Sequence, residues 1–285
     1  MGFRTTSTAV AALAAATIAA SQAHAIDVTL TDANSIARFD LDGTTDNPGP
    51  GLVDWVISGT DIMYEENFWF RFGDAPEQSL HQAQYLASTI VSDTNTNPGD
   101  DTLNALYDVI DGTVGNGDDF LVDVSWFLRG ATGKSSDIAE TIVITNNTSS
   151  RQEFSFFEYT DFDLVPNIQD DIGTRPNANA FDVADAFWFT ETTLTPVPTR
   201  WEMKSYPIIR NKLTDNVATD LDNTISPLGP TDVTWAAQWD ITLAPGGSFE
   251  ISKDKNVSAV PLPAAAWFLL AGVGALGAFG RTRRA

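Results

Sequence analysis

The sequence contains no cysteine and only two histidines among its 285 residues. Without cysteine there can be no disulfide framework, no cysteine nucleophile, no Cys-ligated zinc or iron–sulfur site and no lipoprotein anchor. Basic residues are also scarce, since 16 Lys and Arg stand against 38 Asp and Glu and give a formal net charge of −22. Nucleic acid is therefore not expected as a partner, because binding to phosphates requires a basic surface.

The charges are distributed unevenly along the chain. All 38 acidic residues fall within residues 26–257, whereas four of the 16 basic residues lie outside this range. An acidic middle part is thus flanked by two apolar, basic ends. The sequence predicts three parts, which are 1–25, 26–257 and 258–285.

The first 25 residues have the pattern of a secretory signal peptide. Arg4 is followed by an alanine-rich apolar run, and the segment ends in Ala-His-Ala at 23–25. Small residues at positions −3 and −1, here Ala23 and Ala25, are typical of a cleavage site. We therefore expect export by the Sec machinery and a mature chain beginning at Ile26. The alternative interpretation is an N-terminal helix of the fold.

The last part combines a proline motif, an apolar run and a basic end. An α-helix over the uncharged run at about 264–280 would span about 26 Å at 1.5 Å per residue, slightly less than the ~30 Å hydrocarbon core. Arginines after the run would keep the C-terminus on the cytoplasmic side of a membrane. The motif and the basic end consist of Val260, Pro261, Leu262, Pro263, Ala264, Arg281, Arg283 and Arg284.

This order of motif, apolar helix and basic end resembles the VPLPA variant of the PEP-CTERM sorting signal. Such tails occur on exported proteins of Gram-negative bacteria, often those that make extracellular polysaccharide. The resemblance implies processing by an exosortase-type membrane protease, with an inner-membrane intermediate before the protein reaches the cell surface or the extracellular space. Leu262 stands where the commoner motif has Glu, which leaves the processing site open. An ordinary C-terminal membrane anchor is the alternative.

The middle part, residues 26–257, is rich in short β patterns and poor in helical periodicity. Turn sequences such as DNPGPG at 46–51 and GNGDD at 115–119 separate these patterns. No linker and no internal repeat divides the segment. The sequence therefore predicts one all-β domain, a large antiparallel two-sheet β-sandwich, flanked by the signal peptide and the C-terminal hydrophobic helix.

Some strands and connections can be predicted individually. In Asp118–Leu128, alternation places Val122, Val124, Trp126 and Leu128 on one face, which we expect to be buried. Polar or Pro-Gly turns predict two hairpins, one joining Ile138–Thr145 to Gln152–Leu164 and one joining Val233–Leu243 to Ser248–Ser252. We further expect one strand over Phe181–Thr190 and a helical turn over Pro207–Leu213.

Two acidic turns are candidate calcium sites. Carboxylate and carbonyl oxygens of Asp- and Asn-rich turns are the ligands that Ca²⁺ prefers. The first turn resembles the start of a calcium loop but lacks its final bidentate Glu. The alternative interpretation is ordinary solvated turns. The candidate ligands are Asp40, Asp42 and Asp46 in the first turn and Asn116, Asp118 and Asp119 in the second.

The sequence offers no convincing catalytic constellation. Asp161 and Asp163 alternate on one expected strand, which would place their Cα atoms about 6–7 Å apart on the same face. That separation overlaps the spacing of two glycosidase carboxylates, but spacing is the only requirement met. His81, the one histidine of the middle part, cannot build a His-rich zinc site, and no Gly-x-Ser-x-Gly sequence occurs.

Tryptophans are the remaining candidates for ligand contact. Trp69 and Trp188 each lie between two phenylalanines, so that alternation turns them away from their neighbours. An exposed tryptophan could stack on a sugar ring, whereas burial in the sandwich is the alternative. Together these features predict an exported, non-catalytic protein with a structural or adhesive role in an extracellular polysaccharide (biofilm) matrix. The second hypothesis is a carbohydrate-binding module or a glycan-acting enzyme.

Overall fold

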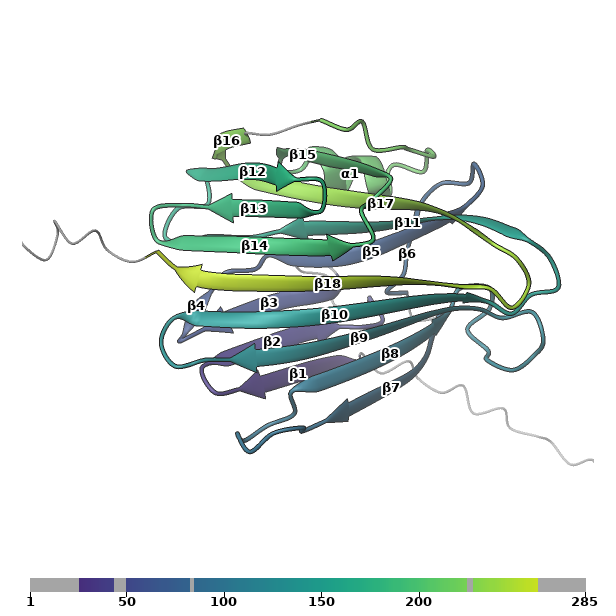
Figure 1. The fold of residues 1–285 in the computed structure, drawn as a ribbon, viewed down its shortest axis with the longest axis horizontal. Coiled ribbons are helices and arrows are strands. Elements are labelled where there is room, and N and C mark those ends of the chain that lie inside the picture. Colours follow the sequence, from purple (N-terminus) through teal and green to yellow (C-terminus); the bar gives the residue numbers. More distant parts are fainter. Residues whose placement is uncertain (1–25, 44–49, 83–84, 225–227, 261–285) are drawn as a thin grey trace, which may run out of the picture.

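A computed structural model describes residues 26–43, 50–82, 85–224 and 228–260 (Figure 1). The predicted signal peptide, Asp46, and the sorting tail from Pro261 onward lie outside these residues. Within the described ranges, no helix is both long and apolar enough to cross a membrane.

The chain forms two antiparallel sheets that pack face to face (Figure 1). Sheet A contains, in spatial order, β1 (Asp27–Asp32), β2 (Ser35–Asp40), β3 (Gly51–Ile57), β5 (Glu65–Phe72), β11 (Gln152–Asp161), β17 (Val233–Leu243) and β15 (Arg200–Ser205), with β4 (Thr60–Asp61) beside β3 and β6 (Gln78–Ser79) beside β5. Sheet B contains β16 (Leu228–Thr231), β12 (Asp171–Asn177), β13 (Ala180–Ala184), β14 (Trp188–Thr195), β18 (Ser248–Ala259), β10 (Ser135–Asn146), β9 (Phe120–Gly130), β8 (Thr102–Asp108) and β7 (Leu86–Ser92). The predicted large antiparallel β-sandwich is confirmed.

Side-chain alternation explains the core. On β9, Val122, Val124, Trp126 and Leu128 are at most 2% exposed, as predicted from their common face. The inward residues of sheet A are largely aromatic, including five phenylalanines of β5 and β11 that pack against one another. On β9 and β10 of sheet B, every second residue remains partly exposed on the outer face. In sheet A, β5 and β11 are buried at nearly every position, because further chain segments cover much of the outer face.

Both predicted hairpins are wrong in their pairing. β10 lies in sheet B and β11 in sheet A, and β17 and β18 are likewise in different sheets. The turn sequences therefore carry the chain from one sheet to the other instead of reversing it within one sheet. Each of these strands pairs with a strand distant in sequence, as in the β10–β18 and β11–β17 ladders.

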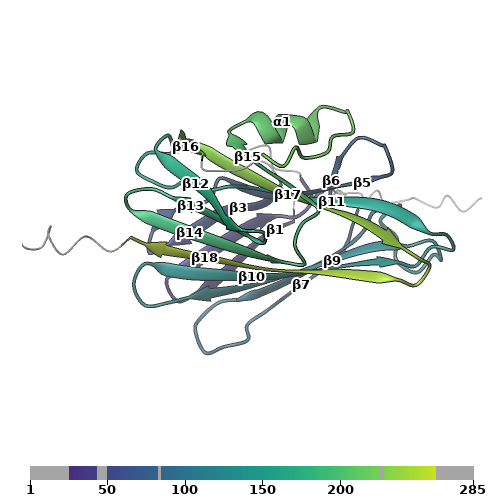
Figure 2. The same ribbon diagram turned by 45° about the horizontal axis from the view of Figure 1, so that its top comes forward.

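Two shorter predictions have different outcomes. The segment 181–190 is not one strand, because the Asp185 carboxylate accepts hydrogen bonds from the N–H groups of Phe187 and Trp188 and forms the turn between β13 and β14. The helical turn near 207–213 is confirmed as α1 (Ile208–Thr214). Figure 2 shows α1 on the outer face of sheet A, above β15 and β17.

Five charged side chains lie in the interior between the sheets. Lys253 and Lys255 project inward from β18 and form ion pairs with Glu66, Glu140 and Glu158 from three other strands. All five side chains are at most 1% exposed. Since two of the glutamates come from sheet A and the lysines from sheet B, this network links the two sheets.

The pKa values of this network indicate how its charges balance. Burial opposes ionisation of Glu66, but Lys253 and Lys255 lower its pKa to about 2. Burial raises the pKa of Glu158 to about 8, and the nearby Glu66 charge acts in the same direction. A protonated Glu158 therefore leaves two lysines facing two carboxylates, which keeps a fully buried network close to neutral.

Candidate functional site

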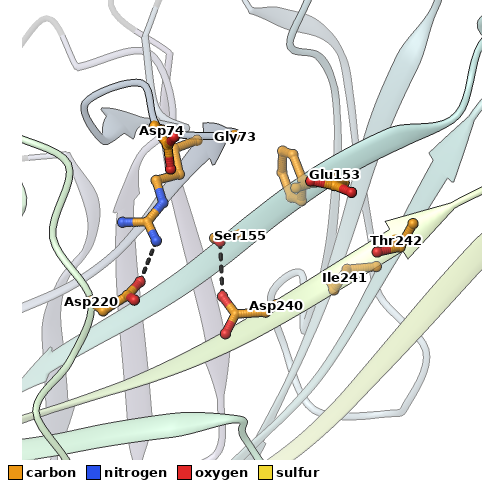
Figure 3. A pocket seen from close by; sticks show the side chains of 10 residues that line it. Gly73, Asp74, Glu153, Ser155, Asp220, Asp240, Ile241 and Thr242 are labelled. Carbon is orange, nitrogen blue, oxygen red and sulfur yellow. Dashed lines mark hydrogen bonds and ion pairs between the residues drawn. The ribbon is translucent and has the colours of Figure 1, made fainter.

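A polar groove of about 270 Å³ crosses β5, β11 and β17 on the outer face of sheet A (Figure 3). Phe70 and Phe72 point into the core, so alternation turns Arg71 outward, and the same rule places Ser155 and Asp240 on this face. We call this site the Arg71 groove. Its polar side chains are Arg71, Asp74, Glu153, Ser155, Asp220, Asp240 and Thr242.

Arg71 is held rigidly at one side of the groove. Its NH1 group donates to Glu77 Oε1 at 2.7 Å and to the Thr219 carbonyl, and its NH2 group donates to Asp220. The guanidinium carbon also lies 5.3 Å from the centre of the Phe157 ring. Burial opposes the charge on Arg71, but the hydrogen bonds to Asp220 and Glu77 raise its pKa above that of a free arginine.

A hydrogen-bonded row continues across the groove (Figure 3). Ser155 Oγ donates to Asp240 Oδ1 at 2.9 Å. Gln238 Nε2 donates to Asp240 Oδ1 at 2.7 Å and to Asp220 Oδ1 at 2.9 Å. Arg200 reaches the second oxygen of each aspartate, at 3.3 Å for Asp220 and 3.8 Å for Asp240. Fixed donors thus orient both carboxylates, whose side chains remain 44% and 39% exposed.

These groups form a preorganised set of charged hydrogen-bonding partners. Burial alone would raise the pKa of Asp220, but hydrogen bonds from Gln238 and Arg71 lower it below 3.8, so this carboxylate is ionised at neutral pH. Ionised carboxylates accept hydrogen bonds from hydroxyl groups, and guanidinium groups donate to them. The groove can therefore bind a ligand that carries several hydroxyl groups.

His81 does not contribute to the groove. His81 is 1% exposed, lies between the sheets, and has its Nδ1 atom 2.9 Å from the Tyr107 hydroxyl. Burial lowers the pKa of His81 to about 4, so its ring is neutral at physiological pH. Proton transfer in the groove would fall to carboxylates such as Glu153 and Asp240.

The prediction that Trp69 and Trp188 stack on a glycan needs correction. Each is only 3% exposed, whereas stacking requires an open ring face. Trp69 packs with Tyr159 beneath α1, where Ile209 and Leu213 cover it. Trp188 belongs to the main core. Both follow the alternative interpretation, although Trp69 is buried on the outer face by a helix from a distant part of the sequence.

The candidate calcium turns are occupied by internal hydrogen bonds. Asp40 Oδ1 accepts from the N–H groups of Asp42 and Gly43, and both aspartates are at most 5% exposed. In the second turn, both Asp119 oxygens accept the Gly115 N–H group. Asn116 donates to Asp111 and accepts from the N–H of Asp118. Within the described ranges, neither turn brings three acidic ligands together.

The Asp161–Asp163 pair is placed differently from the prediction. Strand β11 ends at Asp161, so Asp163 lies beyond the strand and the two do not alternate along it. Their carboxylates nevertheless approach each other, together with Asp232, which the sequence analysis missed. Asp232 is distant in sequence, and only the pairing of β11 with β17 brings it to this place.

Comparisons with known proteins identify the fold. No family model matches the sequence, and no curated protein matches it. Three solved structures cover 83% of this chain and nearly all of their own length. They are a putative aldose 1-epimerase from Escherichia coli K12 (TM-score 0.54, 11% identity, 100% of that chain), the Slr1438 protein from Synechocystis sp. PCC 6803 (0.52, 12%, 97%) and a galactose mutarotase related enzyme from Lactobacillus acidophilus (0.51, 11%, 98%). The chain therefore has an aldose epimerase-like β-sandwich fold.

Proposed function

We propose that this protein binds carbohydrate in the Arg71 groove. The observation that carries the proposal is the fixed row from Arg71 through Asp220 and Gln238 to Asp240 and Ser155, which presents charged donors and acceptors on three neighbouring strands and one adjoining loop. Sugar hydroxyls can both donate to such carboxylates and accept from such guanidinium groups.

The size and setting of the groove support one sugar unit as the ligand. Its volume of about 270 Å³ lies just below the range of about 300–1,000 Å³ typical of drug-sized ligands. Two of the similar structures are described as a putative aldose 1-epimerase and a galactose mutarotase related enzyme, and both names refer to sugar chemistry. The likeness supports a saccharide ligand, while the choice between binding and catalysis depends on the groove.

Binding without turnover is the function that the groove supports best. Asp220 and Asp240 form ion pairs or hydrogen bonds with Arg71, Arg200, Gln238 and Ser155. These contacts fix the two carboxylates in position to bind a ligand. A general acid or base near neutral pH would instead need a pKa close to 7, and the pKa of Asp220 is shifted the other way.

Saccharide titration of the full-length protein tests this proposal. We expect galactose, glucose or an oligosaccharide of such units to bind, and Glu153→Gln with Asp240→Asn to weaken binding by about 10-fold or more, because charge-assisted hydrogen bonds are lost. Asp27→Asn, an exposed change on β1, is the matched control. Equal affinity of the double variant and the wild type would refute binding in the groove. Accelerated mutarotation of freshly dissolved galactose would instead support the glycan-acting alternative.

We further propose that the protein is exported and acts at the cell surface or in the extracellular polysaccharide matrix, with a structural or adhesive role. The signal-peptide pattern and the VPLPA-type tail support this location. Deleting residues 261–285, which follow β18, should leave a processed protein in the periplasm or the medium. An unprocessed cytoplasmic protein would contradict the proposal.

A further inference from the structure

Six aspartates gather at one end of the sandwich, at the left in Figure 1, where β12 begins and β13 turns into β14. They come from the end of β11, the segment that leads into β12, the β13–β14 turn and the residue between β16 and β17. We call this region the aspartate edge. In each of its two groups of three, carboxylate oxygens lie within 4.8 Å of one another: Asp161, Asp163 and Asp232, and Asp170, Asp171 and Asp185.

The central carboxylates of both groups are buried and incompletely satisfied. Asp171 is 0% exposed, and neither of its oxygens has a hydrogen-bond partner among the described residues. Asp161 is 1% exposed; its Oδ2 accepts from the Tyr159 hydroxyl at 3.0 Å, while Oδ1 has no partner among the residues described. A buried carboxylate without a partner is costly, so the fold would not be expected to retain two of them without compensation.

The neighbouring charges make this cost larger. Burial raises the pKa of Asp171 to about 8, and the charges of Asp185, Asp170 and Asp232 add to the effect. Burial also raises the pKa of Asp161 far above 3.8, with Asp232 and Asp163 acting in the same direction. The carboxylates of the two groups therefore disfavour one another's ionisation, and a bound cation would relieve this repulsion.

We propose that the aspartate edge binds divalent calcium, with one ion position in each group of three. Calcium takes six to eight oxygen ligands at about 2.3–2.6 Å, so two oxygens on opposite sides of the ion lie about 4.6–5.2 Å apart. Oxygens within 4.8 Å of one another can share such an ion. Magnesium, with ligands at about 2.0–2.1 Å in a strict octahedron, tolerates less spread and fits this arrangement less well.

The first group also has room for the rest of a coordination shell. Asp161, Asp163 and Asp232 line a pocket of about 140 Å³ together with Tyr64 and Tyr206, whose ring centres lie 5.9 Å apart. A water molecule occupies about 30 Å³ in the liquid, so the pocket can hold an ion and several waters. The waters would supply the ligands that three carboxylates do not provide.

Other calcium sites in this chain are less well supported. The turns at Asp40 and Asp119 direct their carboxylates to backbone N–H groups. At the aspartate edge, Asp185 directs one oxygen to the backbone and leaves Oδ2 without a partner among the described residues. The aspartate edge differs from these turns because it contains buried carboxylate oxygens that have no hydrogen-bond partner among the described residues.

Thermal unfolding of the full-length protein tests the proposal. In EDTA the melting temperature should be low, and Ca²⁺ at about 100 times its Kd should raise it by about 5–10 °C, because a ligand selective for the folded state stabilises that state. Mg²⁺ should raise it less. Equal melting temperatures in EDTA and in millimolar Ca²⁺ would overturn the proposal.

Substitution locates the effect. Asp161→Asn with Asp171→Asn should abolish the response to Ca²⁺ while leaving the melting temperature in EDTA equal to or above that of the wild type, since the repulsion is removed. Asp118→Asn, in an exposed predicted turn, is the matched control and should keep the full response. A full response of the double variant would contradict the assignment.

A spectroscopic measurement keeps the test independent of folding of the variants. Terbium is a calcium substitute whose emission is sensitised by nearby aromatic side chains, and Tyr64 and Tyr206 flank the first group. We expect terbium emission in the wild-type protein that millimolar Ca²⁺ displaces. Absence of displaceable emission would count against the site, whatever the outcome for carbohydrate binding.

Discussion

Two clusters of buried carboxylates in this protein differ in the sign of the charges that surround them. Between the sheets, Glu66, Glu140 and Glu158 meet the ammonium groups of Lys253 and Lys255. At the aspartate edge, the strongest charges acting on Asp161 and Asp171 are those of other carboxylates. The interior network obtains its positive charge from the chain itself, whereas the edge is arranged to obtain it from solution.

This difference shows that acidic residues in a chain with a net charge of −22 have to be interpreted from the charges around each of them. A buried carboxylate paired with a lysine contributes to the structure, and losing its partner is costly. At the aspartate edge, buried carboxylates face other carboxylates, and the proposed calcium ions supply the positive charge that the chain does not. The Arg71 groove lies between these two cases. Its exposed aspartates have arginine partners but can still accept hydrogen bonds from a ligand.

The largest effect is expected from breaking the interior network. Lys253→Met removes one ammonium group from three glutamates and should lower the free energy of unfolding by about 3–5 kcal/mol, because buried negative charge is left uncompensated. Chemical denaturation measures this change. Lys134→Met, at an exposed lysine, is the control. A loss below about 1 kcal/mol for Lys253→Met would show that the network does not depend on this charge.

The second effect concerns the pH dependence of calcium binding at the aspartate edge. In the calcium-free protein, the pKa of Asp171 is about 8 when folded and near 3.8 when unfolded, so the folded state holds a proton that the unfolded state releases. The free energy of unfolding should therefore fall between about pH 4 and pH 8 through this group.

Calcium competes with that proton, so its stabilising effect should be larger at pH 8 than at pH 5. Melting temperatures with Ca²⁺ and with EDTA at both pH values measure the difference. In Asp171→Asn the contribution of this carboxylate is absent, and the pH dependence of the calcium effect should be smaller. An equal calcium effect at pH 5 and pH 8 in the wild type would contradict the raised pKa.

A third, smaller effect separates the groove from the edge. Asp240→Asn should weaken saccharide binding by about 1.5–3 kcal/mol, because a hydrogen bond to a charged group is lost. The same variant should respond to Ca²⁺ like the wild type, since Arg200 lies near this carboxylate in the absence of any ion. Calorimetric titration with saccharide and with Ca²⁺ measures both. A lost calcium response would mean that the two sites are coupled.

The smallest effect is expected in the predicted calcium turns. Asp118 is exposed, so Asp118→Asn should change the free energy of unfolding by less than about 0.5 kcal/mol and leave calcium affinity unchanged. Denaturation with and without Ca²⁺ measures this. A marked loss of calcium affinity would restore this turn as a candidate site.

The sequence predicts strands well and their partners poorly. Alternation on β9 predicted the buried face from Val122 to Leu128, because period-2 patterning is a local property. The connections after β10 and β17 have the composition of hairpin turns, because a polar turn is similar in sequence whether it reverses the chain within one sheet or carries it to the other. Sheet assignment depends on long-range pairing, which a single sequence does not display.

The candidate sites show the same limit. Arg71 and Asp240 stand at outward positions of expected strands, but their meeting depends on β5, β11 and β17 being neighbours. Asp161 and Asp163 are neighbours in the sequence, whereas Asp232 and Asp171 come from distant segments. Alternation places Trp69 on the outer face of its strand. It is nevertheless buried, because α1 covers it through contacts that local periodicity does not encode.

Direct measurement of bound calcium is the clearest test of the contrast between the interior network and the aspartate edge. Equilibrium dialysis of the full-length wild-type protein against Ca²⁺ should give two bound ions per chain, and Asp161→Asn with Asp171→Asn should bind none at these positions. Lys134→Met should retain both ions. Absence of bound calcium in the wild type, or unchanged binding in the double variant, would contradict the account.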